Sequence, residues 1–453
     1  MRILTRIVIV VALVIVAIVT AMFLAGRDIP APDTSDLVVE RPVVAAEQNA
    51  YTFFLAVTNV FHAPTNTLLI SDYLEGKPVD EGAVEQFITT NAAAMALIER
   101  GLAFRSCIVP EVTSYGALLP YLSPWKNMGR VMAMKTRHDR LAGHYVQATD
   151  TCISLLKFGD MIQADAGSII NYLVAIAIQG IGQAQAQDLA RDKGLPPEEL
   201  IRLLNALASP GPLIPGLVRA IKVEYGCSAD TVDQIRDGKL GMGELMNLGG
   251  GDPPSLLKGK RIPSYFFQPN ATKLIFANGY RQMIRDAPHC YADLQHTCVN
   301  TGWKYKQEGR TTFITRPNAV GKILYGLLVP ALDLVLERKC RTETSLTATR
   351  LIVACNAYRN QQGKMPEDLQ ALVPTYLAAI PSDPYDGKAF RYVPSKEIVY
   401  SAGKDLKDSG GSNRVPGDDN GHSQDQRRWE AEDIVFEIED TTSATPTAAV
   451  RLP

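Results

Sequence analysis

The chain has 453 residues, of which 46% are apolar and 21% are charged. This composition excludes a collagen-like or disordered chain, and the length allows two or three domains of usual size. Because 46 basic residues stand against 48 acidic ones, the net charge is −2 and gives no global attraction to nucleic acid.

The first predicted element is a transmembrane anchor over residues 7–26. No residue from Ile7 to Gly26 is charged, and a helix of that length crosses the roughly 30 Å hydrocarbon core of a bilayer. A cleaved signal sequence is the alternative, but its apolar region usually has only about 7–15 residues, so we favour an uncleaved anchor. Arg2 and Arg6 precede the segment.

The positive-inside rule makes residues 1–6 a cytoplasmic tip and places everything after the anchor on the other side of the membrane. The expected location is therefore the inner (cell) membrane, with a single pass and the bulk of the chain extracytoplasmic, which in a bacterium is the periplasm. Residues 27–41 hold prolines and several acids without an apolar period, and we predict a short spacer there.

Residues 42–237 are predicted to form an all-helical domain, because apolar residues recur at helical spacing and strand-like alternation is nearly absent. Residues 238–267 are glycine-rich, proline-rich and basic, which is typical of a surface linker. Residues 268–320 hold a further helix and a connecting region, and Asn270 is the expected N-cap of that helix.

Residues 321–440 are predicted to form a small α+β domain. A long helix ends at Gly363, with Pro330 either as its first residue or as a kink. A short helix and a tight turn follow, and the turn ends in Asp386-Gly387. The expected strands are 390–393, 398–401 and 434–438, of which the first two form an antiparallel hairpin. Residues 441–453 are expected to be a disordered tail. The predicted fold class is thus mainly α with a short antiparallel sheet.

This last domain resembles the globular domain of type II secretion system major pseudopilins, while the rest of the chain resembles no characterised family. The matching residues are Tyr358, Gly363, Pro366, Tyr376, Leu377, Pro381, Asp383, Pro384, Gly387, Tyr392, Tyr400, Gly403 and Asp405. Tyr385 stands where the family usually has tryptophan, and Met365 replaces an aromatic residue. The family's leader and apolar helix are not contiguous with this domain, so the resemblance implies a shared domain shape and not polymerisation.

The resemblance also implies a calcium site, because the family binds calcium in the loop before its last strand. The implied ligands in this sequence are Asp405, Asp408, Asp418, Asp419 and Asp433. Of these, only the position of Asp405 follows the family motif. A solvated loop without metal is the alternative, because the strict spacing of a calcium loop is absent and nearby arginines offset the acidic charge. No other cofactor is predicted.

Two cysteines near the middle of the chain, Cys290 and Cys298, lie beside histidines. In an exported chain they can form a local disulfide, remain as unpaired thiols or, with His289 and His296, bind zinc. The spacing argues against zinc, since adjacent ligands from one segment do not converge easily.

No catalytic residue is predicted, because the chain lacks the common nucleophile, metalloprotease, phosphate-binding and dinucleotide-binding motifs. The leading hypothesis is a membrane-anchored extracytoplasmic protein that acts through contacts with other envelope proteins, as an interaction or secretion-associated structural component. The alternative is an extracytoplasmic enzyme with its site in the helical body.

Overall fold

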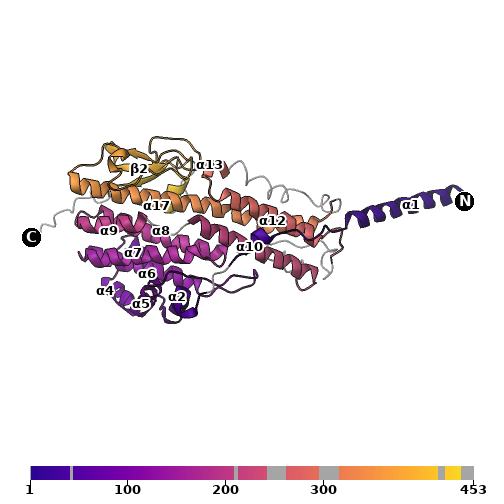
Figure 1. The fold of residues 1–453 in the computed structure, drawn as a ribbon, viewed down its shortest axis with the longest axis horizontal. Coiled ribbons are helices and arrows are strands. Elements are labelled where there is room, and N and C mark those ends of the chain that lie inside the picture. Colours follow the sequence, from indigo (N-terminus) through magenta and orange to yellow (C-terminus); the bar gives the residue numbers. More distant parts are fainter. Residues whose placement is uncertain are drawn as a thin grey trace, which may run out of the picture.

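The computed structural model describes residues 2–40, 44–208, 213–241, 262–294, 316–416 and 424–439. This part of the chain is mainly helical and contains one small antiparallel sheet. Figure 1 shows an elongated molecule in which α1 (Arg2–Ala25) projects from one end and the sheet lies toward the other. The helices before residue 241 are α2 (Ala50–Val60), α3 (Leu69–Leu74), α4 (Glu81–Thr90), α5 (Ala92–Leu102), α6 (Leu122–Leu141), α7 (Tyr145–Ala164), α8 (Ile169–Arg191), α9 (Pro197–Ala208) and α10 (Leu213–Arg236).

The second half of the chain adds fewer helices and all three strands. Its α-helices are α12 (Pro269–Asp286), α13 (Tyr291–Leu294), α16 (Ala319–Leu328), α17 (Pro330–Gln362) and α18 (Gln424–Glu430). Short 3-10 turns are η1 (Ser35–Leu37), η2 (Ala46–Gln48), η4 (Leu369–Leu372) and η5 (Pro394–Lys396). The strands are β1 (Arg391–Val393), β2 (Ile398–Ser401) and β3 (Ile434–Glu437).

Helix α1 is long and apolar enough to cross a membrane. Its apolar part, Thr5–Ala25, has 21 residues, a mean hydropathy of 3.3 and no buried share. Helix α8 also passes a test of length and composition, but it is 61% buried over its most apolar window. Because it is buried to this extent, α8 is a core helix, and it packs against α6, α7, α10 and α17.

Local signals set the ends of the long helix α17. Pro330 is its first residue, where the missing N–H costs no hydrogen bond, so the choice between start and kink is settled as a start. Gly363 ends it with φ of 72°, a conformation that glycine adopts without a steric penalty. The expected N-cap of α12 is wrong by two positions: α12 begins at Pro269, and Asn270 lies inside its first turn.

The sheet has the order β1-β2-β3, with both pairs antiparallel. In the hairpin Tyr392 pairs with Val399, and on the other side Val399 pairs with Phe436. The predicted strands and hairpin are therefore confirmed to within one residue.

One hydrophobic core joins the helical body to the sheet. Leu189 of α8 and Leu203 of α9 belong to the same cluster of buried residues as Leu351 of α17 and Val399 of β2. Helix α17 thus lies between the body and the sheet, as Figure 1 shows. Most of the predicted linker, residues 242–261, lies outside the described residues, but Phe266 and Phe267 at its end are buried in a second cluster.

Candidate functional site

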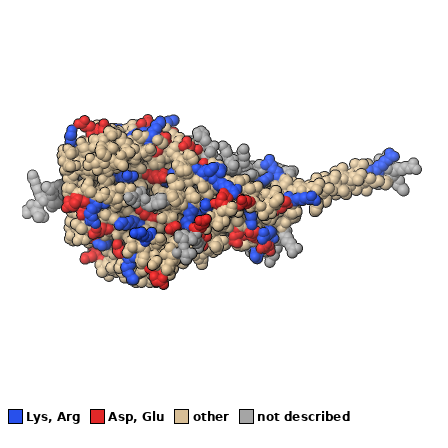
Figure 2. All heavy atoms as spheres, viewed as in Figure 1, with Lys and Arg blue, Asp and Glu red and all other residues tan. Residues whose placement is uncertain are grey.

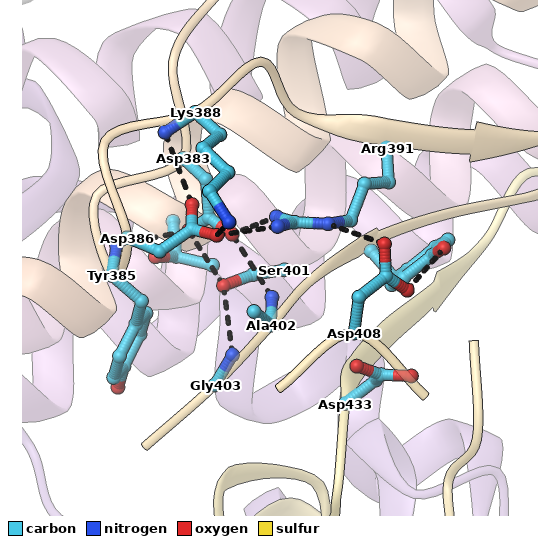
Figure 3. A network of polar contacts seen from close by, with 12 residues as sticks. Asp383, Tyr385, Asp386, Lys388, Arg391, Ser401, Ala402, Gly403, Asp408 and Asp433 are labelled. Atoms are coloured by element: carbon cyan, nitrogen blue, oxygen red, sulfur yellow. Dashed lines mark hydrogen bonds and ion pairs between the residues drawn. The ribbon is translucent and has the colours of Figure 1, made fainter. Parts of the chain in front are cut away.

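A network of charged residues connects the tight turn after η4 to the sheet and to the loop before β3 (Figure 3). At its centre is Asp383, whose side chain is fully buried. One carboxylate oxygen accepts hydrogen bonds from Tyr385 N at 2.9 Å and Ser401 Oγ at 2.7 Å. The other accepts from Ala402 N at 2.9 Å and from Arg391. Asp383 therefore ties the turn to the end of β2.

The turn itself follows from its sequence. Pro381 and Pro384 restrict the backbone, and Gly387 has φ of 73°, which favours glycine. The Gly387 amide donates to the Asp383 carbonyl at 2.9 Å and so closes the turn. The predicted turn is confirmed, and it places two aspartates beside the first strand.

Arg391, the first residue of β1, contacts three carboxylates. Its Nη1 lies 2.6 Å from Asp383 Oδ2, its Nη2 donates to Asp386 Oδ2, and its Nε lies 3.1 Å from Asp408 Oδ2. The Arg391 side chain is 12% exposed and that of Asp386 is 6% exposed, whereas Asp408 is 51% exposed. Burial by itself would lower the pKa of Arg391. The hydrogen bond to Asp386 and the charges of Asp386 and Asp383 outweigh this effect and raise the pKa above its ordinary value. The guanidinium is thus a permanent cation held among three anions.

Asp408 fixes the loop on the outer side of this network. It accepts from Tyr400 Oη at 2.9 Å and from Gly410 N at 3.0 Å. Burial opposes ionisation of Asp408, but these bonds and Arg391 hold the pKa of its carboxyl below the usual value. Burial and the adjacent Asp408 charge raise the pKa of Tyr400 to about 12. At neutral pH Asp408 is therefore ionised and Tyr400 is a neutral donor.

The residues of the expected calcium site have separate roles. Asp433 is fully buried and accepts three backbone amides, from Ser409 at 3.2 Å and from Gly411 and Ser412 at 2.9 Å each. Asp405 is exposed and accepts from Lys407 N at 3.0 Å.

Among the described residues, no three His, Cys, Asp or Glu side chains are arranged to hold a metal ion. Of the described members of the implied set, Asp408 and Asp433 accept hydrogen bonds from several protein donors, and Asp405 accepts one from Lys407 N. Asp418 and Asp419 lie outside the described residues. Calcium binding by this loop stays a prediction.

Arg391 was not among the predicted site residues, although the sequence contains a signal for it. Asp383 and Asp386 stand just before a predicted strand whose first position is an arginine. Charged residues that are only a few positions apart are brought together when a tight turn joins their segments. Chemically, the network is a closed set of ion pairs that fixes the shape of the sheet surface, with its carboxylates occupied by internal donors.

The thiols divide into buried and half-buried groups. Cys107, Cys152, Cys227, Cys340 and Cys355 are buried among the described residues. Cys290 is half-buried and its Sγ lies 3.4 Å from Asp293 Oδ2. Cys298 and His296 lie outside the described residues, so the disulfide stays a prediction.

A second polar cluster lies in the helical body, where an enzyme would have its site. Ser228 Oγ of α10 is 3.0 Å from Tyr115 Oη and 2.8 Å from Tyr280 Oη of α12. Burial raises the pKa of both tyrosines, so both phenols are protonated at neutral pH. Burial also raises the pKa of Glu224, against the effect of its hydrogen bond with Tyr115. The cluster is a chain of three hydroxyl groups with one carboxyl at its end, in which Ser228 and Tyr280 are buried and Tyr115 is 40% exposed.

A small cavity between α7, α8, α9 and α17 is lined by Asp160, Gln179 and Gln183 together with apolar side chains. Its volume of about 10 Å³ is room for one water molecule and not for a substrate.

Comparison of the whole chain with protein-family models, with curated proteins and with solved structures finds no match.

Proposed function

We propose that this protein is a single-pass, membrane-anchored extracytoplasmic protein that presents a pseudopilin-like domain to other envelope proteins. The observation that carries the proposal is the position of two unlike parts at opposite ends of one elongated molecule. Helix α1 leaves one end with its apolar side chains exposed, and the small sheet lies toward the other (Figure 1).

The surface of α1 supports a membrane anchor. Figure 2 shows no charged group along α1 between the basic group near its free end and the charges where it joins the body. Apolar residues such as Ile9, Val10 and Ile15, which lie on different sides of the helix, are more than half exposed. A helix that is apolar all round needs an apolar surrounding, and a bilayer provides one. Arg2 and Arg6 at the free end favour a cytoplasmic tip.

The order of elements in the last domain supports the pseudopilin-like assignment. A long helix, α17, is followed by η4, a tight turn, the β1-β2 hairpin, a long loop and β3. This is the order that the resemblance implies for the family's globular domain. The family's leader does not precede this helix, so the proposal concerns presentation of the domain and not assembly into a filament.

Protein contact is favoured over catalysis by the chemistry of the domain surface. The ion network around Arg391 has its carboxylates bound to internal donors, so it leaves no free nucleophile or base of its own. Strands β1 and β3 each pair with β2 on one side only. A sheet edge offers backbone hydrogen bonds to an incoming segment of another protein.

Photo-crosslinking in growing cells tests this proposal. A photoreactive residue replaces Glu367 or Lys388, whose side chains are 85% and 76% exposed near the sheet. The control replaces Leu118, which is 90% exposed on the helical body. We expect both sheet-domain sites, and not the control, to crosslink to the same envelope protein, identified by mass spectrometry. The absence of a common protein product from the two sites would count against the proposal.

A further inference from the structure

The junction between α1 and the body is held by hydrogen bonds and not by a free linker. The Gln268 side chain, which is buried, donates to the carbonyl of Ala25 at 2.6 Å. Its own backbone amide donates to Asn318 at 3.0 Å, so the body holds Gln268 in place. Gly26 follows directly and packs so closely that an added Cβ would lie 3.0 Å from Tyr265 N and 3.1 Å from Ser264 Oγ.

Just after the junction, Asp28 and Ile29 accept hydrogen bonds from the N-terminus of α12. Asp28 accepts hydrogen bonds from the backbone amides of Asn270 at 2.8 Å and Ala271 at 3.0 Å. Asn270 Nδ2 donates to the carbonyl of Ile29 at 2.9 Å. A carboxylate on the first amides of a helix is stabilising, because those amides have no partner within the helix and carry the positive end of the helix dipole.

The rest of the predicted spacer also lies against the body. Arg281 of α12 donates to both oxygens of Asp36, at 2.8 and 2.7 Å, and to the carbonyl of Asp33 at 2.7 Å. Bonding to Arg281 holds the pKa of Asp36 below its ordinary value, so the pair stays charged at neutral pH. Leu37 is 3% exposed within the core formed by α10 and α12. Residues 28–40 are therefore a strap along the body.

These contacts leave no slack between the end of α1 and the body. Gly26 is the last residue before Arg27, so it marks the edge of the hydrocarbon core if α1 spans the bilayer. The headgroup layer beyond that edge is roughly 5–8 Å thick on each side. A Cβ added to Gly26 would lie about 3 Å from Ser264 Oγ and Tyr265 N, so both residues pack directly against Gly26 and lie within this layer.

We infer that the end of the body at Pro263, Ser264 and Tyr265 is a lipid-binding surface that lies among the phospholipid headgroups around α1. The tyrosine ring suits this position, because aromatic rings with a polar end favour the membrane interface. Arg27, placed over the Phe23 ring at 5.9 Å, is available to the phosphates at the same level. The inference rests on the proposed membrane anchor and adds that the body is seated on the bilayer instead of hanging from a tether.

Spin labels on the full-length chain in phospholipid nanodiscs test the inference. A cysteine introduced at Ser264 or, as a second position in case the first disturbs the junction, at Pro263 carries the label at the proposed surface. Each is made in a chain in which Cys290 and Cys298 are replaced by serine, because the five other native cysteines are buried. Ser395, an exposed serine of η5 in the sheet domain, is the matched control. Ala17 in the middle of α1 reports insertion of the anchor. Collision of each label with oxygen, which concentrates in lipid, and with a water-soluble nickel chelate gives its depth.

We expect the Ala17 label to lie in the hydrocarbon core and the Ser395 label in water. The Ser264 and Pro263 labels are expected at headgroup depth, with a several-fold lower collision rate with nickel than the Ser395 label. If the Ala17 label is in the hydrocarbon core while both junction labels match Ser395, the lipid-binding surface is refuted and the anchor stands. If the Ala17 label is itself in water, the anchor is refuted and the surface with it.

Discussion

Replacing Arg391 by alanine removes the cation at the centre of the sheet-domain network. Two of its partners, Asp383 and Asp386, are buried, and breaking a buried ion pair on one side usually costs about 3–5 kcal/mol. The third partner, Asp408, is half exposed, so its share is small, about 0–1 kcal/mol. Asp383 keeps its bonds from Tyr385, Ser401 and Ala402. The expected loss is therefore near the lower limit, about 3 kcal/mol.

The loss of stability is expected in the sheet domain, so a measurement that reports on this domain separately detects it best. Amide hydrogen exchange of the full chain, read by mass spectrometry, reports the loop that Asp408 holds. The Gly410 amide, which donates to Asp408, is expected to exchange on the order of 100-fold faster in Arg391→Ala if its opening free energy falls by about 3 kcal/mol. Peptides of α10, far along the chain and in another core cluster, are the internal control.

Two matched variants separate charge from geometry. Arg391→Lys keeps the charge but not the planar fork that reaches three carboxylates, so we expect an intermediate loss. In the double variant Arg391→Met with Asp386→Asn, the second substitution removes an anion that the first would leave unpaired. We expect this variant to recover part of the lost stability. If Arg391→Ala changes neither the exchange of the loop nor the melting temperature, the network does not hold the domain and the reasoning is wrong.

Three further predictions concern other positions. The buried hydroxyl of Tyr385 has no hydrogen-bond partner among the described residues, so Tyr385→Phe should raise the free energy of unfolding by about 1 kcal/mol in urea denaturation. Burial raises the pKa of Glu224, so its carboxyl binds a proton more tightly in the folded state than in the unfolded state. The free energy of unfolding therefore falls as the pH rises from the unfolded-state pKa to the folded-state pKa. We expect Glu224→Gln to melt at a higher temperature than the wild type at pH 8 and at the same temperature at pH 4. If the loop before β3 binds calcium, calcium raises the melting temperature and Asp405→Ala abolishes the rise, whereas a melt that calcium and chelator leave unchanged rejects the site.

Sequence patterns predicted the elements whose signals are local. Pro330 and Gly363 set the limits of α17 because proline and glycine act on their own backbone. The hairpin followed from two short apolar runs with a turn between them, and the bounds of its strands differ from the expectation by no more than one residue.

Apart from Arg391, whose partners are close in sequence, the missed features depend on contacts between residues far apart in sequence. The strap was predicted as a spacer because prolines and acids without an apolar period have that appearance in a sequence. Its binding partners, Asn270 and Arg281, lie more than 240 positions away. The position of Asp28 at the start of α12 also explains why Asn270 is not the N-cap, since the capping group comes from elsewhere in the chain.

The small net charge of −2 is accompanied by ion pairs between acidic and basic side chains within the molecule. Arg281 neutralises Asp36, Arg391 lies among three aspartates, and Arg414 pairs with Glu432 at 2.5 Å. Figure 2 shows both signs of charge mixed over the visible face of the body. A surface of this kind creates no extended field, so long-range electrostatic steering contributes little to encounter with a partner. If the sheet domain binds another envelope protein, recognition must rest on shape and on backbone groups at the sheet edge, and crosslinking yield should change little with ionic strength.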